Sequence, residues 1–276
     1  MRIVSLAPSN TEILYALGCG DEIVACTRFC DYPEEAKQKP RIGDWLDVND
    51  ELVLRHKPDA VMTSTFVQDR IAGRCRKKGI ALFHTDPKTL EQVYESILAI
   101  GKFVHKEQGA YELVQSMKSD FNEVANSMKK ESNNGKNPIK EKTITNKQKI
   151  SINNNGKIKV YCEEWHKPPT VSGNWVPKVI ELAGGISLCP EGRVSHPVSP
   201  EEAAAFGPEC IVLSICGMGV KASPKLITAR KGWHSLKAVK ENRVFIIDDS
   251  LLNRPGPRLA EGARQLQGYF LSLGPQ

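Results

Sequence analysis

The side chains best suited to hold a ligand are tryptophans that stand among polar, glycine and proline residues. Three of the four tryptophans occupy such segments: Trp45, Trp165 and Trp175. Aromatic side chains in loops can form the apolar walls of a pocket for a large, flat small molecule. We therefore treat these three as candidate ligand contacts, with packing as the alternative for each. Trp233, in the segment Lys-Gly-Trp-His-Ser-Leu, reads as a packing residue.

Two histidines lie in the same kind of segment. His166 follows Trp165, and His196 precedes a proline. A neutral imidazole is the commonest nitrogen ligand of metals, although an isolated loop histidine more often makes ordinary hydrogen bonds. Either histidine could approach a metal centre, and we leave that role unassigned.

Eight cysteines offer a second kind of chemistry, but none forms a Cys-x-x-Cys pair. Several fall in apolar runs, where a reduced cysteine behaves as a small buried apolar group. Buried free thiols are the simplest interpretation, and they favour a reducing compartment.

The sequence carries few signs of an enzyme, a nucleic-acid binder or a membrane-spanning protein. It lacks G-x-S-x-G, H-E-x-x-H, a P-loop and a strand-linked G-x-G-x-x-G. The net charge is +6, without an arginine-rich helix or an aromatic and basic platform, so we expect no nucleic-acid partner. No apolar run approaches the roughly 20 residues of a membrane span.

Strands and helices alternate in the first half of the chain. Arg2–Leu6 reads as a strand, and Ser9 with Glu12 has capping-box spacing at the start of a helix. The further elements that we expect are strands at 22–26, 60–63 and 80–83, and helices at 50–55 and 68–78. This alternation indicates parallel βαβ units.

The second half repeats the pattern. Ser199-Pro200 with the acids that follow is a strong helix start. Its phrase Ala-Ala-Ala-Phe-Gly-Pro-Glu-Cys-Ile-Val-Leu-Ser-Ile aligns with Leu-Val-Leu-Arg-His-Lys-Pro-Asp-Ala-Val-Met-Thr-Ser of the first half. Expected strands lie at 157–162, 210–214 and 243–247, and expected helices at 175–183 and 224–231. We predict an α/β protein of two similar βαβ lobes, 1–88 and 157–276.

Two different segments separate these lobes. Residues 89–130 have helical periodicity, with Thr89 and Gln92 as a capping box and a long helix from about Lys106. A single long helix that joins two lobes is a stiff connector. Residues 131–156 are rich in Asn, Lys and Ser and poor in large apolar groups, so we expect a disordered insert without a core.

The chain resembles the helical-backbone substrate-binding proteins of ABC importers, which receive vitamin B12, ferric siderophores or haem. The phrases that carry the resemblance are the opening residues 2–45, Val-Ser-Pro-Glu-Glu and Leu-Leu-Asn-Arg-Pro-Gly-Pro-Arg-Leu, and the vitamin B12 branch looks nearest. The resemblance covers nearly all of the chain except 131–156. It implies two lobes joined by one long helix, with a corrinoid bound between them and no catalytic cofactor.

The resemblance also implies site residues. Trp45 matches a tryptophan that lines the corrinoid pocket, His196 falls near a pocket aromatic, and Arg254 matches a ligand-lining arginine. It further implies an ABC permease with its ATPase as partner, met through an exposed glutamate on each lobe. Glu201 or Glu202 matches in the second lobe, although acids also favour a helix start by themselves. Gln68-Asp69 stands where a glutamate is expected in the first lobe, so Asp69 is the candidate there.

Several alternatives stay open at this point. The ligand could be a ferric siderophore or haem in place of a corrinoid. A less favoured rival is a metal- or corrinoid-dependent enzyme of similar architecture that uses Cys26, Cys30 or Cys216. We expect a monomer. If a leader has been removed, the protein is periplasmic or on the cell surface, and if Met1 is the native start, it is cytoplasmic.

Overall fold

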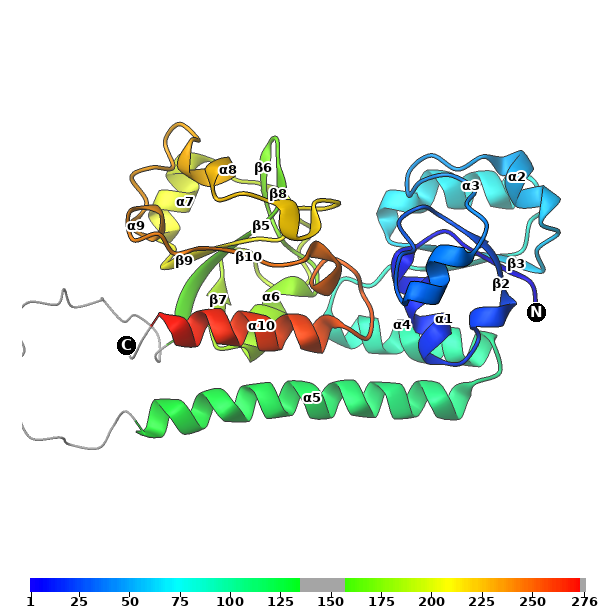
Figure 1. The fold of residues 1–276 in the computed structure, drawn as a ribbon, viewed down its shortest axis with the longest axis horizontal. Coiled ribbons are helices and arrows are strands. Elements are labelled where there is room, and N and C mark those ends of the chain that lie inside the picture. The colour runs from blue at the N-terminus through cyan, green and yellow to red at the C-terminus, as the bar shows by residue number, and fades with distance from the viewer. Residues whose placement is uncertain (135–156, 274–276) are drawn as a thin grey trace, which may run out of the picture. The chain divides into compact units, whose positions relative to one another are not determined.

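The computed structural model of the chain describes residues 1–134 and 157–273 (Figure 1). These residues form two compact units. Unit 1 comprises Met1–Met117 and Arg254–Pro257, and unit 2 comprises Lys118–Asn253 and Arg258–Gln276. The chain therefore passes from one unit to the other three times. The predicted insert begins within helix α5 (Glu107–Asn134), and its remaining residues, 135–156, lie outside the described residues.

Unit 1 is built on a four-stranded parallel sheet in the order β2-β1-β3-β4. In this sheet Ile3 lies opposite both Ile23 and Ala60, and the pairing of β1 with β2 shifts register between Ile3 and Val4. Apolar side chains cover both faces because helices flank a parallel sheet on each side. The core beneath one face includes Val4, Leu6 and Val61. The strands are β1 (Ile3–Ser5), β2 (Ile23–Cys26), β3 (Ala60–Ser64) and β4 (Leu82–Thr85).

Four helices and three short 3-10 turns complete the first unit. Asn49 caps α2 and Thr89 caps α4 through their side chains, and the second of these caps was predicted. The predicted capping box of Ser9 and Glu12 is wrong, because α1 begins at Pro8 after Ala7 and has no side-chain cap. The helices are α1 (Pro8–Ala16), α2 (Asp50–Arg55), α3 (Asp69–Lys77) and α4 (Leu90–Phe103), and the turns are Gly20–Glu22, Glu34–Gln38 and Phe66–Gln68.

Unit 2 contains a six-stranded mixed sheet in the order β10-β9-β5-β6-β8, with β7 paired to β5. The strands β7, β9 and β10 run parallel to their neighbours, whereas β6 and β8 form antiparallel pairs. The strands are β5 (Ile158–His166), β6 (Pro169–Val171), β7 (Gly185–Ser187), β8 (His196–Pro197), β9 (Cys210–Leu213) and β10 (Val244–Ile246).

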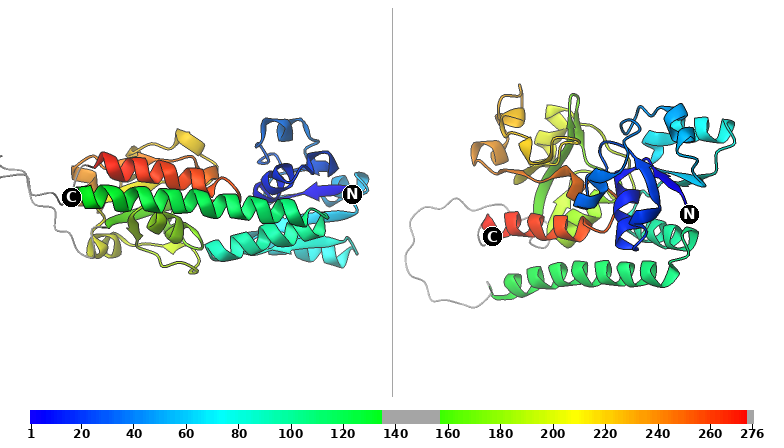
Figure 2. Two further views of the ribbon diagram at one scale, coloured as in Figure 1. Left: turned by 90° about the horizontal axis from the view of Figure 1, so that it is seen from below. Right: turned by 45° about the vertical axis from the view of Figure 1, so that its right-hand side comes forward.

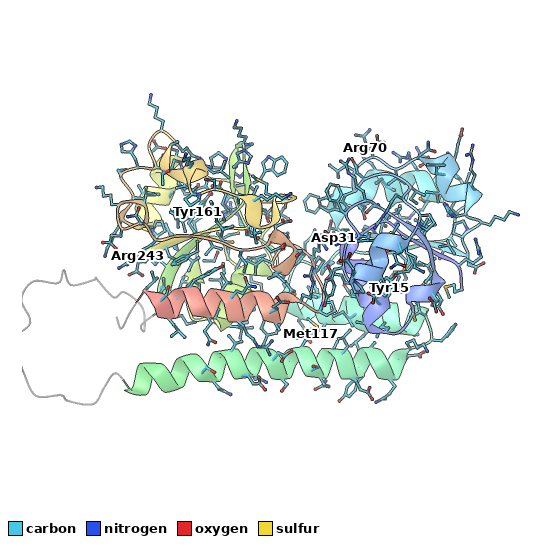
Figure 3. The ribbon with its side chains drawn as sticks, viewed as in Figure 1. Tyr15, Asp31, Arg70, Met117, Tyr161 and Arg243 are labelled. Atoms are coloured by element: carbon cyan, nitrogen blue, oxygen red, sulfur yellow. The ribbon has the colours of Figure 1, made fainter. Side chains whose placement is uncertain are left out.

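Helices surround the sheet of unit 2, and the start of α7 is capped as predicted. Ser199 Oγ accepts from the backbone N–H of Glu202 at 3.1 Å, and Pro200 is the first residue of that helix. The core includes Tyr161, labelled in Figure 3, whose ring packs on that of Trp233 with centroids 4.9 Å apart. The helices are α6 (Val176–Leu182), α7 (Pro200–Phe206), α8 (Lys225–Thr228), α9 (Lys237–Lys240) and α10 (Leu259–Ser272), with 3-10 turns at Gly219–Lys221 and Asp249–Leu251.

Helix α5 belongs to both units, which confirms the prediction of a single long connecting helix. Its buried side chains recur every three or four residues: Ala110, Val114, Met117, Phe121 and Val124. Within unit 2, α10 lies alongside α5, as Figures 1 and 2 show. Gln267 Nε2 donates to the carbonyl of Val124 at 2.7 Å, and Arg264 forms an ion pair with Asp120. Among the described residues, no helix combines the length and apolar character needed to cross a membrane.

Candidate ligand-binding site

In unit 1 the loops after the strands gather at one edge of the sheet, because all four strands are parallel. Trp45 lies in the loop between β2 and α2, with its side chain partly exposed. Its backbone carbonyl accepts a hydrogen bond from Gln68 Nε2 at 3.0 Å. The structure therefore holds the predicted tryptophan at the sheet edge where ligands of α/β proteins bind.

Gln68 is the residue that fixes this edge, and the sequence analysis missed that role. Its side chain is buried, and its amide also donates to the carbonyl of Leu6 at 2.9 Å. Its Oε1 accepts from the backbone N–H of Ser64 at 2.9 Å. One side chain thus joins the ends of β1 and β3 to the Trp45 loop. The sequence signal is weak: a polar residue stands four residues after the strand 60–64 and immediately before the start of a helix.

Backbone strain accompanies this arrangement. Thr65, between β3 and Gln68, has φ 63° and ψ 155°, a conformation that branched side chains rarely adopt. The hydrogen bonds from Thr65 N to Thr85 O at 2.7 Å and from Gln68 N to Thr65 O at 3.0 Å hold it in place. Strain of this kind persists only where the surroundings enforce it, and it clusters at functional sites.

Arg254, the predicted ligand-lining arginine, forms ion pairs with two carboxylates. In unit 1 its Nη1 lies 2.8 Å from Glu12 Oε1 on α1 and 2.7 Å from Asp31 Oδ1. Asp31 is labelled in Figure 3. Glu12 is almost fully buried, so a buried carboxylate and a buried guanidinium neutralise each other. The main role of Arg254 in the structure is to attach residues 254–257 to unit 1.

In unit 2 the candidate residues surround an antiparallel hairpin, β5–β6, which the sequence analysis did not predict. Trp165 lies near its tip opposite Thr170, and the residue is 49% exposed. The indole N–H donates to the carbonyl of Lys167 at 2.9 Å, which orients the ring. An oriented and half-exposed aromatic face is suited to contact a flat ligand.

Trp175 has a different environment. It is 4% exposed at the start of α6, and its indole N–H donates to the carbonyl of Leu252 at 2.8 Å. A side chain this enclosed offers little surface to a ligand. The structure therefore favours the packing alternative for Trp175, as it does for Trp233, which is 1% exposed.

His196 lies on β8, opposite Val171. Its Nδ1 is 3.3 Å from the carbonyl of Val194, and its Nε2 is 3.9 Å from Glu202 Oε1 without a hydrogen bond. His166 Nδ1 likewise has no hydrogen-bond partner. Both imidazoles thus have one buried nitrogen without a hydrogen-bond partner. Within the described ranges, no group of three His, Cys, Asp or Glu side chains gathers to hold a metal ion.

Two adjacent glutamates at the end of β5 were also missed. Glu163 is fully buried and receives both terminal nitrogens of Arg230 at 2.7 Å, together with the hydroxyl of Tyr161 at 2.8 Å. Glu164 has no such cation, and burial raises the pKa of its carboxyl to about 7, while a hydrogen bond with Ser195 opposes the rise. The sequence signal for both is a pair of acids that interrupts the apolar run Ile158–Cys162.

A groove of about 550 Å³ lies within unit 2, between the β5–β6 hairpin and the α8 region. Its polar lining consists of His166, Lys167, Lys225 and Arg230, and prolines, Leu226 and Ala229 supply the apolar part. Of these cations, Arg230 is already paired with Glu163. A groove lined by one sign of charge attracts the opposite charge.

The predicted docking residues are all on the surface. Glu201 and Glu202 are exposed in the first turn of α7, and Asp69, at the start of α3, has an exposed side chain 3.5 Å from His84 Nε2. The internal repeat offers another acid in unit 1. Helix α2 precedes β3 as α7 precedes β9, and its capped first turn presents Glu51, which is exposed. The neighbouring Asp50 already forms ion pairs with Arg74 and Lys78.

Two α/β units, each with a parallel strand core, and one long helix shared by both define a substrate-binding protein of the periplasmic type. Residues 3–251 match the family described as "Periplasmic binding protein", and the chain belongs to that family. This membership places the chain among binding proteins of transport systems and not among enzymes.

Three similar proteins illustrate the relationship. An uncharacterised ABC transporter substrate-binding lipoprotein of Bacillus subtilis, YvrC, is 32% identical over 96% of this chain and 78% of its own length. A vitamin B12-binding protein of Vibrio cholerae is 26% identical over 98% of this chain and 88% of its own length. A solved periplasmic heme-binding protein of Pseudomonas aeruginosa has a TM-score of 0.78 and 20% identity, covering 98% of this chain and 92% of that one. The last likeness shows the fold alone.

Proposed function

We propose that this chain is the substrate-binding protein of an ABC importer and that its ligand is a corrinoid of the cobalamin type. The observation that carries the ligand assignment is the similarity to a vitamin B12-binding protein over 98% of the chain. The accessible tryptophans support it, because a corrin ring needs flat apolar surfaces around its polar amide groups.

The proposed contacts differ in part from those first expected. Trp45 in unit 1 and Trp165 with His196 in unit 2 are the ligand contacts that we retain. Trp175 and Arg254 become supporting residues, since one is enclosed and the other is paired with two carboxylates. His196 is proposed as a contact because it lies on β8, which pairs with the β5–β6 hairpin that carries Trp165. Ligation of the cobalt by this imidazole is not needed for the proposal.

The proposed partner is a membrane permease with its ATPase, and an exposed acid on each unit would meet arginines of the permease. In unit 2 these acids are Glu201 and Glu202. In unit 1 we favour Glu51 over Asp69, because Glu51 occupies the repeat-equivalent position in a capped helix and has a longer side chain. Asp69 remains the alternative docking residue of unit 1.

We further propose that the protein acts as a monomer outside the cytoplasmic membrane. The name of the Bacillus relative, a substrate-binding lipoprotein, supports that location. A cytoplasmic binder would have no access to the outward face of an importer.

A second candidate ligand is an anionic iron chelate, either a ferric siderophore or haem. The groove in unit 2 favours it, because Lys167 and Lys225 have no acidic neighbour in its lining. Carboxylates of haem or of a siderophore would be attracted there, whereas the amides of a corrinoid would gain less.

A competition between ligand classes tests the proposal. The purified chain is incubated separately with cyanocobalamin, haemin and a ferric siderophore, freed of unbound ligand, and examined by absorbance and native mass spectrometry. We expect retention of one cyanocobalamin per chain and a calorimetric titration with a single site. Retention of an iron chelate with no retention of cyanocobalamin would transfer the assignment to the second candidate. A Lys167→Glu/Lys225→Glu variant would then lose that chelate.

A further inference from the structure

Two cysteines of unit 1 form a close pair that the transport function does not use. Cys26 ends β2, and Cys30 lies four residues later in the loop that follows. Both residues are fully buried, and the guanidinium of Arg41 contacts Cys26 Sγ and the carbonyl of Cys30. The backbone N–H of Cys30 donates to the carbonyl of Thr27 at 3.1 Å, so a tight turn brings the two side chains together.

A single arginine is centred on this pair. Arg41 Nη1 lies 3.0 Å from Cys26 Sγ, and it also donates to the carbonyls of Thr27 at 2.6 Å and Cys30 at 2.9 Å. Its Nη2 donates to the carbonyl of Ala36 at 3.0 Å. The guanidinium thus contacts both residues and places a fixed positive charge beside the sulfur of Cys26, in the same turn as Cys30, which favours one negative charge on the pair of thiols.

Hydrogen bonds act on both thiols. Burial raises the pKa of Cys30, but hydrogen bonds from Cys26, Thr11 and Thr27 outweigh burial and lower it. The pKa of Cys26 is raised, first by its hydrogen bond to Cys30 and then by burial. One thiolate and one thiol in contact are the starting state for thiol–disulfide exchange.

The other buried cysteines lack this arrangement. Cys162 and Cys210 stand on the neighbouring strands β5 and β9, but the register sets Cys162 opposite Val212 and Cys210 opposite Val160. Burial raises the pKa of Cys162 to about 12 and that of Cys189 to about 11, so neither is a ready nucleophile.

We propose that Cys26 and Cys30 are a redox-active dithiol that closes to an intramolecular disulfide by exchange with a small disulfide such as oxidised glutathione. The Cys30 thiolate attacks one sulfur of glutathione disulfide, whose S–S bond breaks and releases one glutathione thiolate. The Cys26 thiol then loses its proton to solvent and attacks the Cys30 sulfur, releasing the second glutathione. Two protein thiols are oxidised, and one disulfide is reduced to two thiols.

Burial of both sulfurs sets the conditions of the reaction. Neither is exposed to an oxidant in the folded protein, so exchange requires local opening of the loop. We therefore expect slow oxidation in buffer and faster oxidation in urea below the unfolding transition. The loop continues into Asp31, the partner of Arg254, so the closed ring would stiffen the segment that carries this ion pair.

Peptide mapping tests the proposal. The reduced full-length chain is incubated with oxidised glutathione in sub-denaturing urea, alkylated in strong denaturant and digested with trypsin. Cleavage after Arg28 separates the two cysteines, so a disulfide leaves peptides 3–28 and 29–37 joined. We expect the number of alkylated cysteines to fall from eight to six. Eight alkylated cysteines after this treatment would overturn the proposal.

Two single variants sharpen the assignment. Cys26→Ser should abolish the joined peptides and leave a glutathione adduct on Cys30, because the resolving thiol is gone. Cys19→Ser, a matched control within the same peptide, should leave the joined peptides unchanged. Loss of the link in the Cys19→Ser variant would instead assign the bond to Cys19. The peptide map of the wild-type protein tests the disulfide by itself, whether or not the two variants fold.

Discussion

The side-chain amide of Gln68 donates to the backbone carbonyl of Trp45 at 3.0 Å, and this contact ties the candidate ligand residue of unit 1 to the end of its sheet. The same amide reaches Leu6, and its oxygen accepts from Ser64. A buried side chain thus sets the position of an exposed one, so binding should depend on a residue that touches no ligand.

Replacement of Gln68 by Glu tests this dependence. A carboxylate has nearly the same shape and can still accept from Ser64 N–H, but it cannot donate to the carbonyls of Leu6 and Trp45. We expect the free energy of unfolding to fall by about 3 kcal/mol or more, since buried polar groups would lose their partners. Urea denaturation measures the loss, and ligand affinity should fall as well. An unchanged unfolding midpoint would mean that the amide does not organise this edge.

Replacement of Trp45 by Ala should lower ligand affinity and leave stability nearly unchanged. The ring is partly exposed, so stability should change little, while corrinoid affinity should weaken by ~1–3 kcal/mol, the usual range for an aromatic anchor. Calorimetric titration and thermal unfolding provide the two readouts. Trp175→Phe is the matched control, because it removes an enclosed indole and its hydrogen bond to Leu252. That control should lose stability and keep affinity, and equal affinities of wild type and Trp45→Ala would remove Trp45 from the site.

Glu164 should make stability depend on pH. Its pKa is raised to about 7 in the folded state from an ordinary value of 4.5, so the folded chain holds one more proton between these values. The free energy of unfolding should therefore fall as pH rises through this window, by up to about 3 kcal/mol, and then level off. Glu164→Gln should flatten the slope, whereas Glu95→Gln, at an exposed position on α4, should not. Unfolding curves at five pH values would contradict the assignment if the Glu164→Gln slope matched that of the wild type.

The proposed docking role of the acids can be separated from their effect on the stability of their helices. Charge at the first turn of a helix contributes only ~0.3–1 kcal/mol to folding and nothing to transport. We expect Glu201→Lys/Glu202→Lys and Glu51→Lys to keep corrinoid affinity and to lower ATP-coupled uptake in vesicles that contain the cognate permease, because the charge reversal repels permease arginines. Glu95→Lys controls for net charge. Normal uptake by the Glu51 variant with reduced uptake by an Asp69→Lys variant would restore Asp69 as the contact of unit 1.

Local signals in the sequence were enough to predict most of the fold. Helix α2 was expected at 50–55 and is found there, because Asn49 caps its start and Lys57-Pro58 follows its end. The alternation of apolar strands with capped helices likewise identified the two units. The strand β4 begins and ends two residues later than expected, because its pairing with β3 runs from Leu82 to Thr85 and includes the polar His84 and Thr85.

The candidate site was harder to predict because its features depend on distant partners. Trp165 and Trp175 look alike in sequence, yet only Trp175 meets a carbonyl 77 residues away, that of Leu252. The hairpin β5–β6 was missed since Pro168 and Pro169, which turn the chain, also break a strand pattern. The role of Arg254 depends on Glu12, 242 residues earlier, and no local pattern contains that pairing.

The crossing of residues 254–257 into unit 1 has a consequence for biosynthesis. Most of unit 1 leaves the ribosome with residue 117, but Glu12 and Asp31 receive Arg254 only after 137 further residues have been made. Until then Glu12 lacks the guanidinium that pairs with it in the finished fold, so the packing around α1 cannot reach its final state. Unit 1 therefore completes its folding only near the end of synthesis. A fragment that stops at residue 117 would lack the ion pairs of Arg254 and would stay incompletely folded.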